Sequence, residues 1–361
     1  MSPRFAAALL LLPSLALAQA TGAQEPPAPP ETSRAAAGTD VAAHAPELPF
    51  VAKVMRDDAG LRLMVNGQPM LVVGMIWDYI PIGFNYRYNL FAQPEDVIVA
   101  ALDREMGLMK RMGVNAIRVY VGIPAKWIRY IHEKYGLYTV LNPVVGRYGV
   151  TMGGTYNPNT NYADPATRAF LKEEVRTLVR EYKDTPGLLM WLLGNENNYG
   201  LSWRSFEIEA LPTGERDAAK ARYLYSLFGE ILREVKKADP TRPVAIANGD
   251  VQYIDLIAQE CQGLDVFGTN VYRGASARDL FKVVKEKLGV PVMFTEFGAD
   301  AYDAKAQKES DVVQAKYLLA QWQEIYEQSH GKGRDGSAIG GFIFQWSDGW
   351  WKHGQESALD V

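Results

Sequence analysis

Short apolar runs alternate regularly with helical patterns, and this alternation restricts the fold of the chain more than any other feature. Between the runs, apolar residues recur at helical spacing, most clearly across residues 224–235. Regular strand and helix alternation predicts an α/β fold with a parallel sheet, and eight repeats predict a (β/α)8 TIM barrel. A doubly wound open sheet is the alternative. The eight predicted strands cover residues 71–77, 114–121, 137–141, 188–196, 244–248, 264–272, 292–297 and 339–346.

A short β-hairpin is predicted directly before the barrel. Asn66-Gly67 lies between the apolar segments 61–65 and 69–73. This dipeptide readily adopts the positive φ angles that a tight primed turn requires. We therefore expect the folded domain to cover residues 49–361, with the hairpin at its start.

The first 48 residues are expected to be a leader and a linker. Residues 1–20 combine an early Arg, a short apolar stretch and small residues at possible cleavage points after Ala18 or Ala20. This pattern is typical of a secretory signal peptide, so we expect export to the periplasm or the exterior. Residues 21–48 are rich in Ala, Pro, Gly and Thr without apolar periodicity, as in a flexible linker. We predict no membrane span, because no stretch approaches ~20 consecutive apolar residues.

Composition and motif spacing disfavour several classes of function. The chain has 38 Lys and Arg against 42 Asp and Glu, so nothing suggests a nucleic acid as partner. The four His and one Cys lack the spacing of metal ligands, and we predict neither a metal nor another cofactor. Residues 331–336 spell G-x-G-x-x-G, but they follow a helix and precede a strand, the reverse of a dinucleotide site.

Two predicted strands end in a carboxylate, Glu196 on the fourth and Glu296 on the seventh. Active sites of (β/α)8 barrels lie at the strand ends, and alternation lets both side chains point into the mouth. It places Glu196 on the face of Leu192, and Glu296 on the face of Val292 and Phe294. Such a pair suits glycoside hydrolysis, in which one group protonates the leaving oxygen and the other attacks or activates water. Alternatively, each Glu caps a loop or pairs with an Arg.

The two strand ends resemble the signature strands of the clan A glycoside hydrolases. The resemblance rests on W-L-L-G-N-E-N at 191–197 and F-T-E-F-G at 294–298. Family 2 barrels are the most similar, because residues 61–74 also resemble the hairpin that leads into them. The resemblance covers residues 61–351. It implies a retaining mechanism on an oligo- or polysaccharide substrate, with Glu196 as acid/base and Glu296 as nucleophile.

Further site residues are implied by the resemblance. Arg118 matches the strand-two arginine that lies near the nucleophile and keeps it ionised; Tyr272 matches the strand-six tyrosine that donates a hydrogen bond to it. Asn195 matches the residue that binds the sugar 2-hydroxyl, although strict alternation would turn it away from Glu196. An ordinary ion pair for Arg118 and a core position for Tyr272 are the alternatives.

Aromatic residues at strand ends are the last group of candidates. Trp346 matches the strand-eight tryptophan beneath the bound sugar, and Trp77 and Asp78 are predicted contacts in the same subsite. The alternative for the two tryptophans is packing. Long polar and aromatic insertions at 142–164 and 197–214 could form further subsites or have no role in binding.

Two features depart from the family pattern. Family 2 enzymes usually carry β-sandwich domains before the barrel, whereas here the predicted linker precedes the hairpin. Strand three ends in L-N-P at 141–143 rather than in an acidic pair. Three functions stay open. They are hydrolysis of a β-glucan or related glycan, transglycosylation with the same residues, and non-catalytic glycan binding, which the presence of both carboxylates disfavours.

Overall fold

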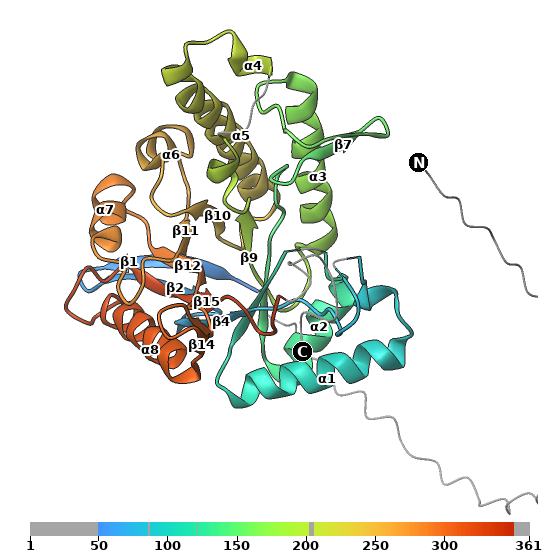
Figure 1. The fold of residues 1–361 in the computed structure, drawn as a ribbon, viewed down its shortest axis with the longest axis vertical. Coiled ribbons are helices and arrows are strands. Elements are labelled where there is room, and N and C mark those ends of the chain that lie inside the picture. Colours follow the sequence, from blue (N-terminus) through green and yellow to red (C-terminus); the bar gives the residue numbers. More distant parts are fainter. Residues whose placement is uncertain (1–49, 86, 121, 202–205, 350–361) are drawn as a thin grey trace, which may run out of the picture. The chain divides into compact units, whose positions relative to one another are not determined.

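The folded unit Pro49–Val361 is built on a closed barrel. The computed structural model describes residues 50–85, 87–120, 122–201 and 206–349, so the predicted signal peptide and linker lie outside the described residues. Eight parallel strands follow one another around the barrel in chain order, and the last pairs with the first (Figure 1). This closure confirms the predicted (β/α)8 fold and excludes the open sheet. The barrel strands are β4 (Val72–Ile76), β5 (Ala116–Val119), β6 (Tyr138–Leu141), β9 (Leu188–Leu193), β10 (Val244–Gly249), β11 (Val266–Val271), β12 (Val292–Phe297) and β15 (Ala338–Ile343).

An α-helix follows each of the first seven barrel strands and packs on the outside. The start of α3 is set by Asp164, whose side chain accepts the N–H of Thr167 at 2.7 Å, with Pro165 in the first helical position. The end of α5 is set by Pro240, whose ring cannot continue a helix. These helices are α1 (Glu95–Arg111), α2 (Ala125–Tyr135), α3 (Pro165–Tyr182), α5 (Arg216–Ala238), α6 (Ile254–Glu260), α7 (Leu280–Lys287) and α8 (Asp311–Glu327).

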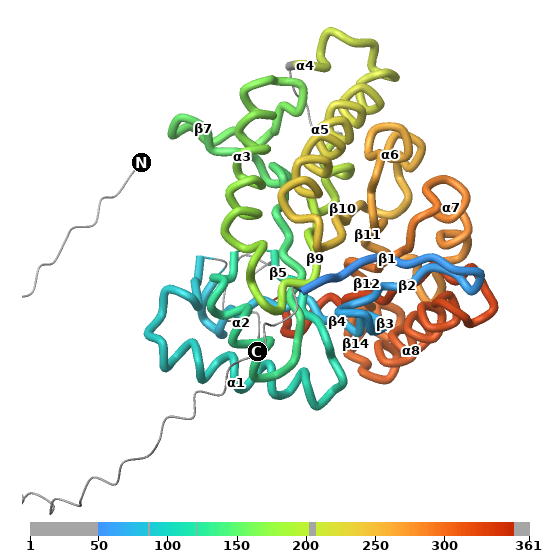
Figure 2. The backbone as a smooth tube through the Cα atoms, turned by 180° about the vertical axis from the view of Figure 1, so that it is seen from behind, coloured from blue at the N-terminus to red at the C-terminus, as the bar shows by residue number. Residues whose placement is uncertain are grey.

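A three-stranded antiparallel sheet covers the end of the barrel opposite the candidate site. The predicted turn is present, with φ of 48° at Asn66 and 81° at Gly67. The sheet contains one strand more than the predicted hairpin, because β1 (Ala52–Asp57) pairs along β2 (Gly60–Val65), which in turn pairs with β3 (Gln68–Met70). The N–H of Ala52 bonds to the carbonyl of Thr241, just before β10 begins. Figure 2 shows this sheet lying beside β4 and β12.

Two apolar layers hold the barrel. Inside, alternate strand residues such as Ile76 and Phe342 pack with Leu63 of the covering sheet, and all three are fully buried. Outside, the other face of each strand packs against the helices, as Phe294 does when it stacks on Phe281 of α7 at 5.3 Å. Since apolar side chains fill the lumen from below, polar groups are confined to the carboxyl ends of the strands.

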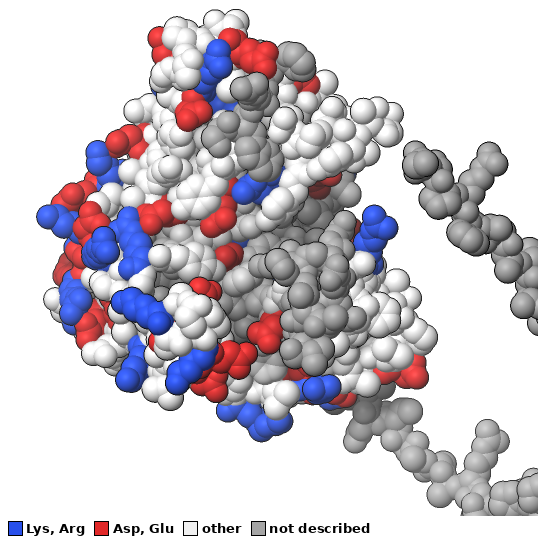
Figure 3. All heavy atoms as spheres, viewed as in Figure 1, with Lys and Arg blue, Asp and Glu red and all other residues white. Residues whose placement is uncertain are grey.

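Short elements lie in the connections that follow the barrel strands. The insertion after β6 forms the hairpin β7 (Val150–Met152) and β8 (Thr155–Asn157), and the one after β9 contains η2 (Asn197–Gly200), α4 (Phe206–Glu209) and η3 (Thr213–Glu215). The remaining elements are η1 (Leu90–Ala92), β13 (Tyr302–Asp303) and β14 (Lys308–Glu309). Across the described ranges, no helix combines the length and apolarity needed to cross a membrane. On the face shown in Figure 3, basic and acidic side chains alternate over α6, α7 and α8.

Candidate active site

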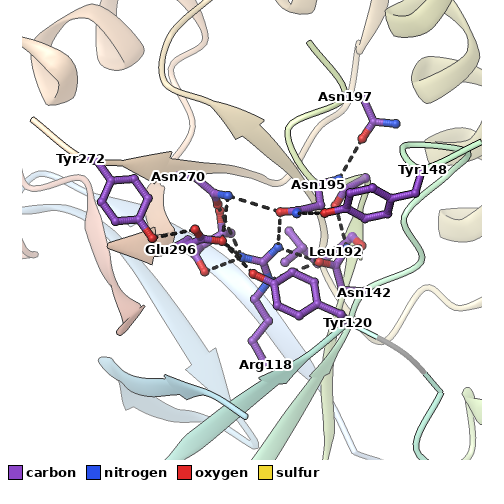
Figure 4. Close-up of polar contacts among 12 residues, drawn as sticks. Arg118, Tyr120, Asn142, Tyr148, Leu192, Asn195, Asn197, Asn270, Tyr272 and Glu296 are labelled. Atoms are coloured by element: carbon purple, nitrogen blue, oxygen red, sulfur yellow. Dashed lines mark hydrogen bonds and ion pairs between the residues drawn. The ribbon is translucent and has the colours of Figure 1, made fainter. Parts of the chain in front are cut away.

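Arg118 is the hub of a polar network at the mouth of the barrel (Figure 4). It lies on β5 and is 0% exposed. Its Nε and Nη2 donate to Oδ1 of Asn142 at 3.1 and 2.7 Å, and Nη2 also donates to Oδ1 of Asn195 at 2.8 Å. Nη1 donates to the carbonyl of Thr295 at 2.6 Å and to Oδ1 of Asn270 at 3.4 Å. The five N–H groups of the guanidinium are thus occupied by neutral acceptors, which fixes its plane.

Glu296 lies beside this cation and collects hydrogen bonds from three side chains. Its Oε2 accepts from the hydroxyl of Tyr120 at 2.7 Å and from Nδ2 of Asn270 at 3.0 Å, and its Oε1 accepts from the hydroxyl of Tyr272 at 2.6 Å. Nη1 of Arg118 is 3.8 Å from Oε2, and the Glu296 side chain is only 12% exposed. All four neighbours stabilise a carboxylate rather than a carboxylic acid.

A β-bulge on β12 brings Glu296 into the mouth. Our expectation that it shares a face with Val292 and Phe294 was wrong, because those two residues pack outward against the helices. The pairing with β11 slips by one residue at Thr295, so that Phe294 opposes Thr269 while Glu296 opposes the very next residue. The extra residue resets the alternation, and both Thr295 and Glu296 reach the network on the inner side.

Glu196 reaches the same mouth by a different route. The fourth strand ends at Leu193, three residues earlier than predicted, and strict alternation therefore does not govern residues 194–196. Gly194 has φ of 74° and Glu196 has φ of 53°, a left-handed conformation that is unfavourable for a residue with a side chain. The Glu196 N–H donates to the carbonyl of Ala247 at 2.9 Å, which holds this bend against β10.

The surroundings of Glu196 favour its protonated form. The side chain is half-buried, and burial raises its pKa above the usual range. The negative charge of Glu296 raises the pKa further, against the smaller opposing effects of Asn270, Arg147 and Arg118. The two carboxyls therefore stand in different environments: burial raises the pKa of Glu196, whereas Glu296 lies among three hydrogen-bond donors beside a cation.

Two asparagines link the halves of the site. Nδ2 of Asn142 donates to the carbonyls of Leu192 and Gly194, each at 2.7 Å, which turns its Oδ1 toward Arg118. The departure from an acidic strand-three end thus has a structural use, since only an amide can donate to those carbonyls and accept from the arginine. Asn195 accepts from Arg118 and Asn270 through Oδ1, and its Nδ2 donates to the hydroxyl of Tyr148 at 3.0 Å.

Several residues of the network were not among the predicted candidates. Tyr120 and Asn270 could have been found, because each lies two positions from a predicted residue, Arg118 or Tyr272, on the same strand face. Tyr148 could not have been found in this way, since the insertion that carries it has no periodicity.

The predicted strand-end aromatics occupy different positions. Trp346 is half-buried after β15, and its indole N–H donates to the carboxylate of Glu105 on α1. Trp77 is 3% exposed and packs edge-on against Phe91 at 6.4 Å. Ile76 faces the lumen, so the next residue, Trp77, turns toward the helices. Trp77 therefore offers no open face to a sugar.

Asp78, the last predicted contact, is half-buried and lies two residues after the end of β4. Among residues 50–349, apart from those left undescribed, no group of three or more His, Cys, Asp or Glu could hold a metal ion. The absence of a cofactor remains a prediction.

Known proteins match the barrel in sequence and in fold. The sequence model of the family 2 glycosyl hydrolases, TIM barrel domain, matches residues 96–337, which is more than half of the chain. A β-galactosidase of Aeromonas hydrophila subsp. hydrophila is 30% identical over 200 residues, and β-galactosidase 2 of Enterobacter cloacae is 27% identical over 193. These matches cover 54% and 52% of this chain but only 15% and 14% of the two relatives.

Solved structures of the same family share the fold. A β-glucuronidase of Bacteroides uniformis superposes with a TM-score of 0.60 at 17% identity, over 85% of this chain and 33% of its own. A β-galacturonidase of Eisenbergiella tayi, bound to galacturonate, superposes with a TM-score of 0.54 at 17% identity, over 84% of this chain and 48% of its own. The chain thus spans a small part of its curated relatives, and it belongs to the family 2 glycosyl hydrolases, whose TIM barrel domain it carries.

Proposed function

We propose that this chain is a retaining β-glycosidase in which Glu296 is the nucleophile and Glu196 is the acid/base. The supporting observation is the opposite environment of the two carboxyls. Glu296 accepts three hydrogen bonds beside a buried arginine, whereas burial and the charge of Glu296 raise the pKa of Glu196. A carboxylate nucleophile and a protonated acid are the two states that double displacement requires at its first step.

The reaction uses these two states in turn. The Glu296 carboxylate attacks the anomeric carbon while Glu196 transfers its proton to the glycosidic oxygen, so that the leaving sugar departs as an alcohol. The covalent bond to Glu296 removes its charge, which lowers the pKa of Glu196 for the second step. Glu196 then takes a proton from water, whose oxygen displaces Glu296 and restores the enzyme with net retention.

Four residues complete the proposed sugar subsite. Tyr272 and Arg118 hold the nucleophile, and Asn195 is positioned by Arg118 and Tyr148 at the side of the acid. Trp346 is proposed as the aromatic surface under the sugar. It follows β15, and its half-buried indole is held by the hydrogen bond to Glu105 of α1. An indole face suits the apolar C–H face of a pyranose.

The substrate that we propose is a β-linked glycan, a β-glucan or a related oligosaccharide. The names of the relatives indicate β-galactosides, β-glucuronides and β-galacturonides as substrates of those proteins. A screen of 4-nitrophenyl β-glycosides of glucose, galactose, glucuronic acid and galacturonic acid, beside β-linked disaccharides, decides among them. Longer products at high substrate concentration would identify transglycosylation.

Proton NMR of the first-formed product tests the mechanism. We expect the β anomer to appear first and mutarotation to come after it. An α anomer as first product would exclude Glu296 as nucleophile, and the absence of turnover on every β-glycoside would leave glycan binding as the function.

Export is proposed on the sequence of residues 1–20. Fractionation of expressing cells and N-terminal sequencing of the protein would test it. Recovery of full-length protein in the cytoplasm alone would contradict this proposal.

A further inference from the structure

Tyr199 is an exposed aromatic residue next to the proposed acid. It belongs to η2, three residues after Glu196, and its backbone N–H donates to the Glu196 carbonyl at 3.0 Å. Its side chain is 44% exposed. The hydroxyls of Tyr120, Tyr148 and Tyr272 are all bound into the polar network, whereas that of Tyr199 bonds to no other described residue. What distinguishes Tyr199 at this mouth is therefore its ring.

A glycine makes room for that ring. Gly249 is the last residue of β10, and a Cβ built on it would stand 2.5 Å from both Cε2 and Cζ of Tyr199. The φ of Gly249 is not positive, so the missing side chain serves close approach rather than backbone conformation. Tyr199 thus lies directly on backbone, in a space that any larger residue would take from it.

Asn198, the residue before Tyr199, holds this contact in place. The Asn198 side chain accepts the N–H of Gly249 at 2.8 Å and donates to its carbonyl at 2.9 Å. Nδ2 of Asn198 also donates to Oε1 of Gln252 at 2.9 Å, and Asn198 is buried. The loop after β9 is therefore fastened to the end of β10 on both sides of the glycine, which orders the tyrosine without using its hydroxyl.

Charged groups act on Tyr199. Burial raises the pKa of Tyr199, and the negative charges of Glu196 and Asp250 raise it further, while Arg273 opposes them. Arg273 is itself paired with Asp250, with Nε 2.7 Å from Oδ2. An aromatic face flanked by fixed polar groups is the usual chemistry of a sugar-binding subsite, because a pyranose has apolar faces and a polar rim.

We propose that Tyr199, placed on Gly249, forms the floor of a subsite for the sugar on the leaving-group side of the cleaved bond. This inference rests on the proposed function, since Glu196 protonates the leaving oxygen and so defines that side. The chemical class of ligand is a pyranose joined through the glycosidic oxygen. The chain would then act on oligosaccharides in preference to glycosides with small leaving groups. It would also accept the hydroxyl group of a second sugar, in place of water, as the acceptor of the glycosyl group.

A substrate without a leaving-group sugar isolates the subsite. β-Glycosyl fluorides of glucose, galactose and glucuronic acid pass through the same attack by Glu296 but leave this subsite empty. The quantity to measure is kcat/KM on the β-linked disaccharide divided by kcat/KM on the fluoride of the same sugar. Because each variant is compared with itself, partial misfolding cancels.

We expect Tyr199→Ala to lower this ratio about five- to tenfold, as the loss of one aromatic contact would. Tyr199→Phe should keep the ratio of the wild type, and Gly249→Ala should lower it by displacing the ring. Tyr326→Ala is the matched control, since Tyr326 lies on α8 and is also exposed, at 51% against 44% for Tyr199; this variant should leave the ratio unchanged.

The outcomes separate the two proposals. A wild-type protein that turns over no fluoride and no disaccharide would overturn the proposed function and the subsite with it. An active wild type whose ratio is unchanged in Tyr199→Ala would overturn the subsite alone. A Tyr199→Phe variant as impaired as Tyr199→Ala would also overturn it, because the hydroxyl rather than the ring would then be responsible.

Discussion

The ends of β9 and β12 present the same side-chain type in opposite ways. Glu296 lies on a strand that continues through it, reoriented by a one-residue bulge and held by three donors and a cation. Glu196 lies beyond the end of its strand, in a left-handed conformation, and is held through its backbone. Glu296 is thus anchored through its oxygens and Glu196 through its backbone, as the proposed roles of nucleophile and acid/base require.

Glu296→Gln removes the carboxylate that is anchored through its oxygens, and it should cause the largest loss of activity. The amide cannot form the covalent intermediate, so we expect kcat on an aryl β-glycoside to fall by at least about 10⁴-fold. Glu309→Gln, an exposed carboxyl on β14, is the control and should behave as the wild type. Activity of Glu296→Gln near the wild-type level would remove the distinction between the two ends.

Glu196→Gln tests the proton-transferring side. We expect a loss of about 10² to 10⁴-fold on a disaccharide, because its leaving oxygen needs the proton. For an aryl glycoside with an acidic phenol, the rate of the glycosylation step should fall much less, because the phenol departs unprotonated. Pre-steady-state release of the phenol measures that step. Equal losses on both substrates would mean that Glu196 does not donate the proton.

Asn142→Asp sharpens the comparison by disturbing the group that connects both ends. An aspartate would turn an oxygen toward two carbonyls and place a second negative charge on Arg118, in competition with Glu296. We expect kcat to fall about 10²-fold and the free energy of unfolding to fall by about 2–4 kcal/mol. Asn157→Asp, exposed on β8, is the matched control. Unchanged unfolding in urea for Asn142→Asp would contradict the assigned orientation of the amide.

The pH dependence of stability gives the smallest expected effect. The pKa of Glu196 is raised in the folded state, mainly by burial, so the folded protein binds its proton more tightly than the unfolded chain does. Stability must then decrease as pH rises from the unfolded pKa, about 4.3, to the raised folded value. Glu196→Gln should therefore be more stable than the wild type at pH 7, with the difference shrinking toward pH 4. Thermal unfolding of both proteins across this range would show it, and a constant difference would contradict it.

Most of the fold and part of the site could be read from residue patterns. The eight strands depend on periodicities of two and 3.6 residues and the hairpin turn at Asn66-Gly67 depends on its dipeptide, and both are local properties. Arg118 and Tyr272 are identified as candidates by the resemblance of their strands to those of the clan A glycoside hydrolases. The bulge at Thr295 and the early end of β9 were not predicted. Each depends on hydrogen bonds to a neighbouring strand, and no local pattern encodes which residue will lack a partner.

The loops and strand ends contain one contact that was missed and one that was wrongly predicted. Tyr148 comes from an insertion with no period, and it is placed by two hydrogen bonds: its hydroxyl accepts from Asn195, and its carbonyl accepts from the hydroxyl of Tyr156 on β8 at 2.8 Å. Trp77 shows the opposite error. A tryptophan at a strand end was predicted to contact the sugar, but alternation after Ile76 turned it into the core.

By itself the sequence determined the alternation of eight strands with helices and the two strand ends that carry a carboxylate, because the apolar periods that define strands and helices are encoded residue by residue. Only the tertiary structure decided which glutamate is surrounded by hydrogen-bond donors and a cation and which has its pKa raised by burial. That difference arises from burial, from Arg118 and from donors at the ends of two other strands, β5 and β11, and distances between strands are set by packing of the whole barrel.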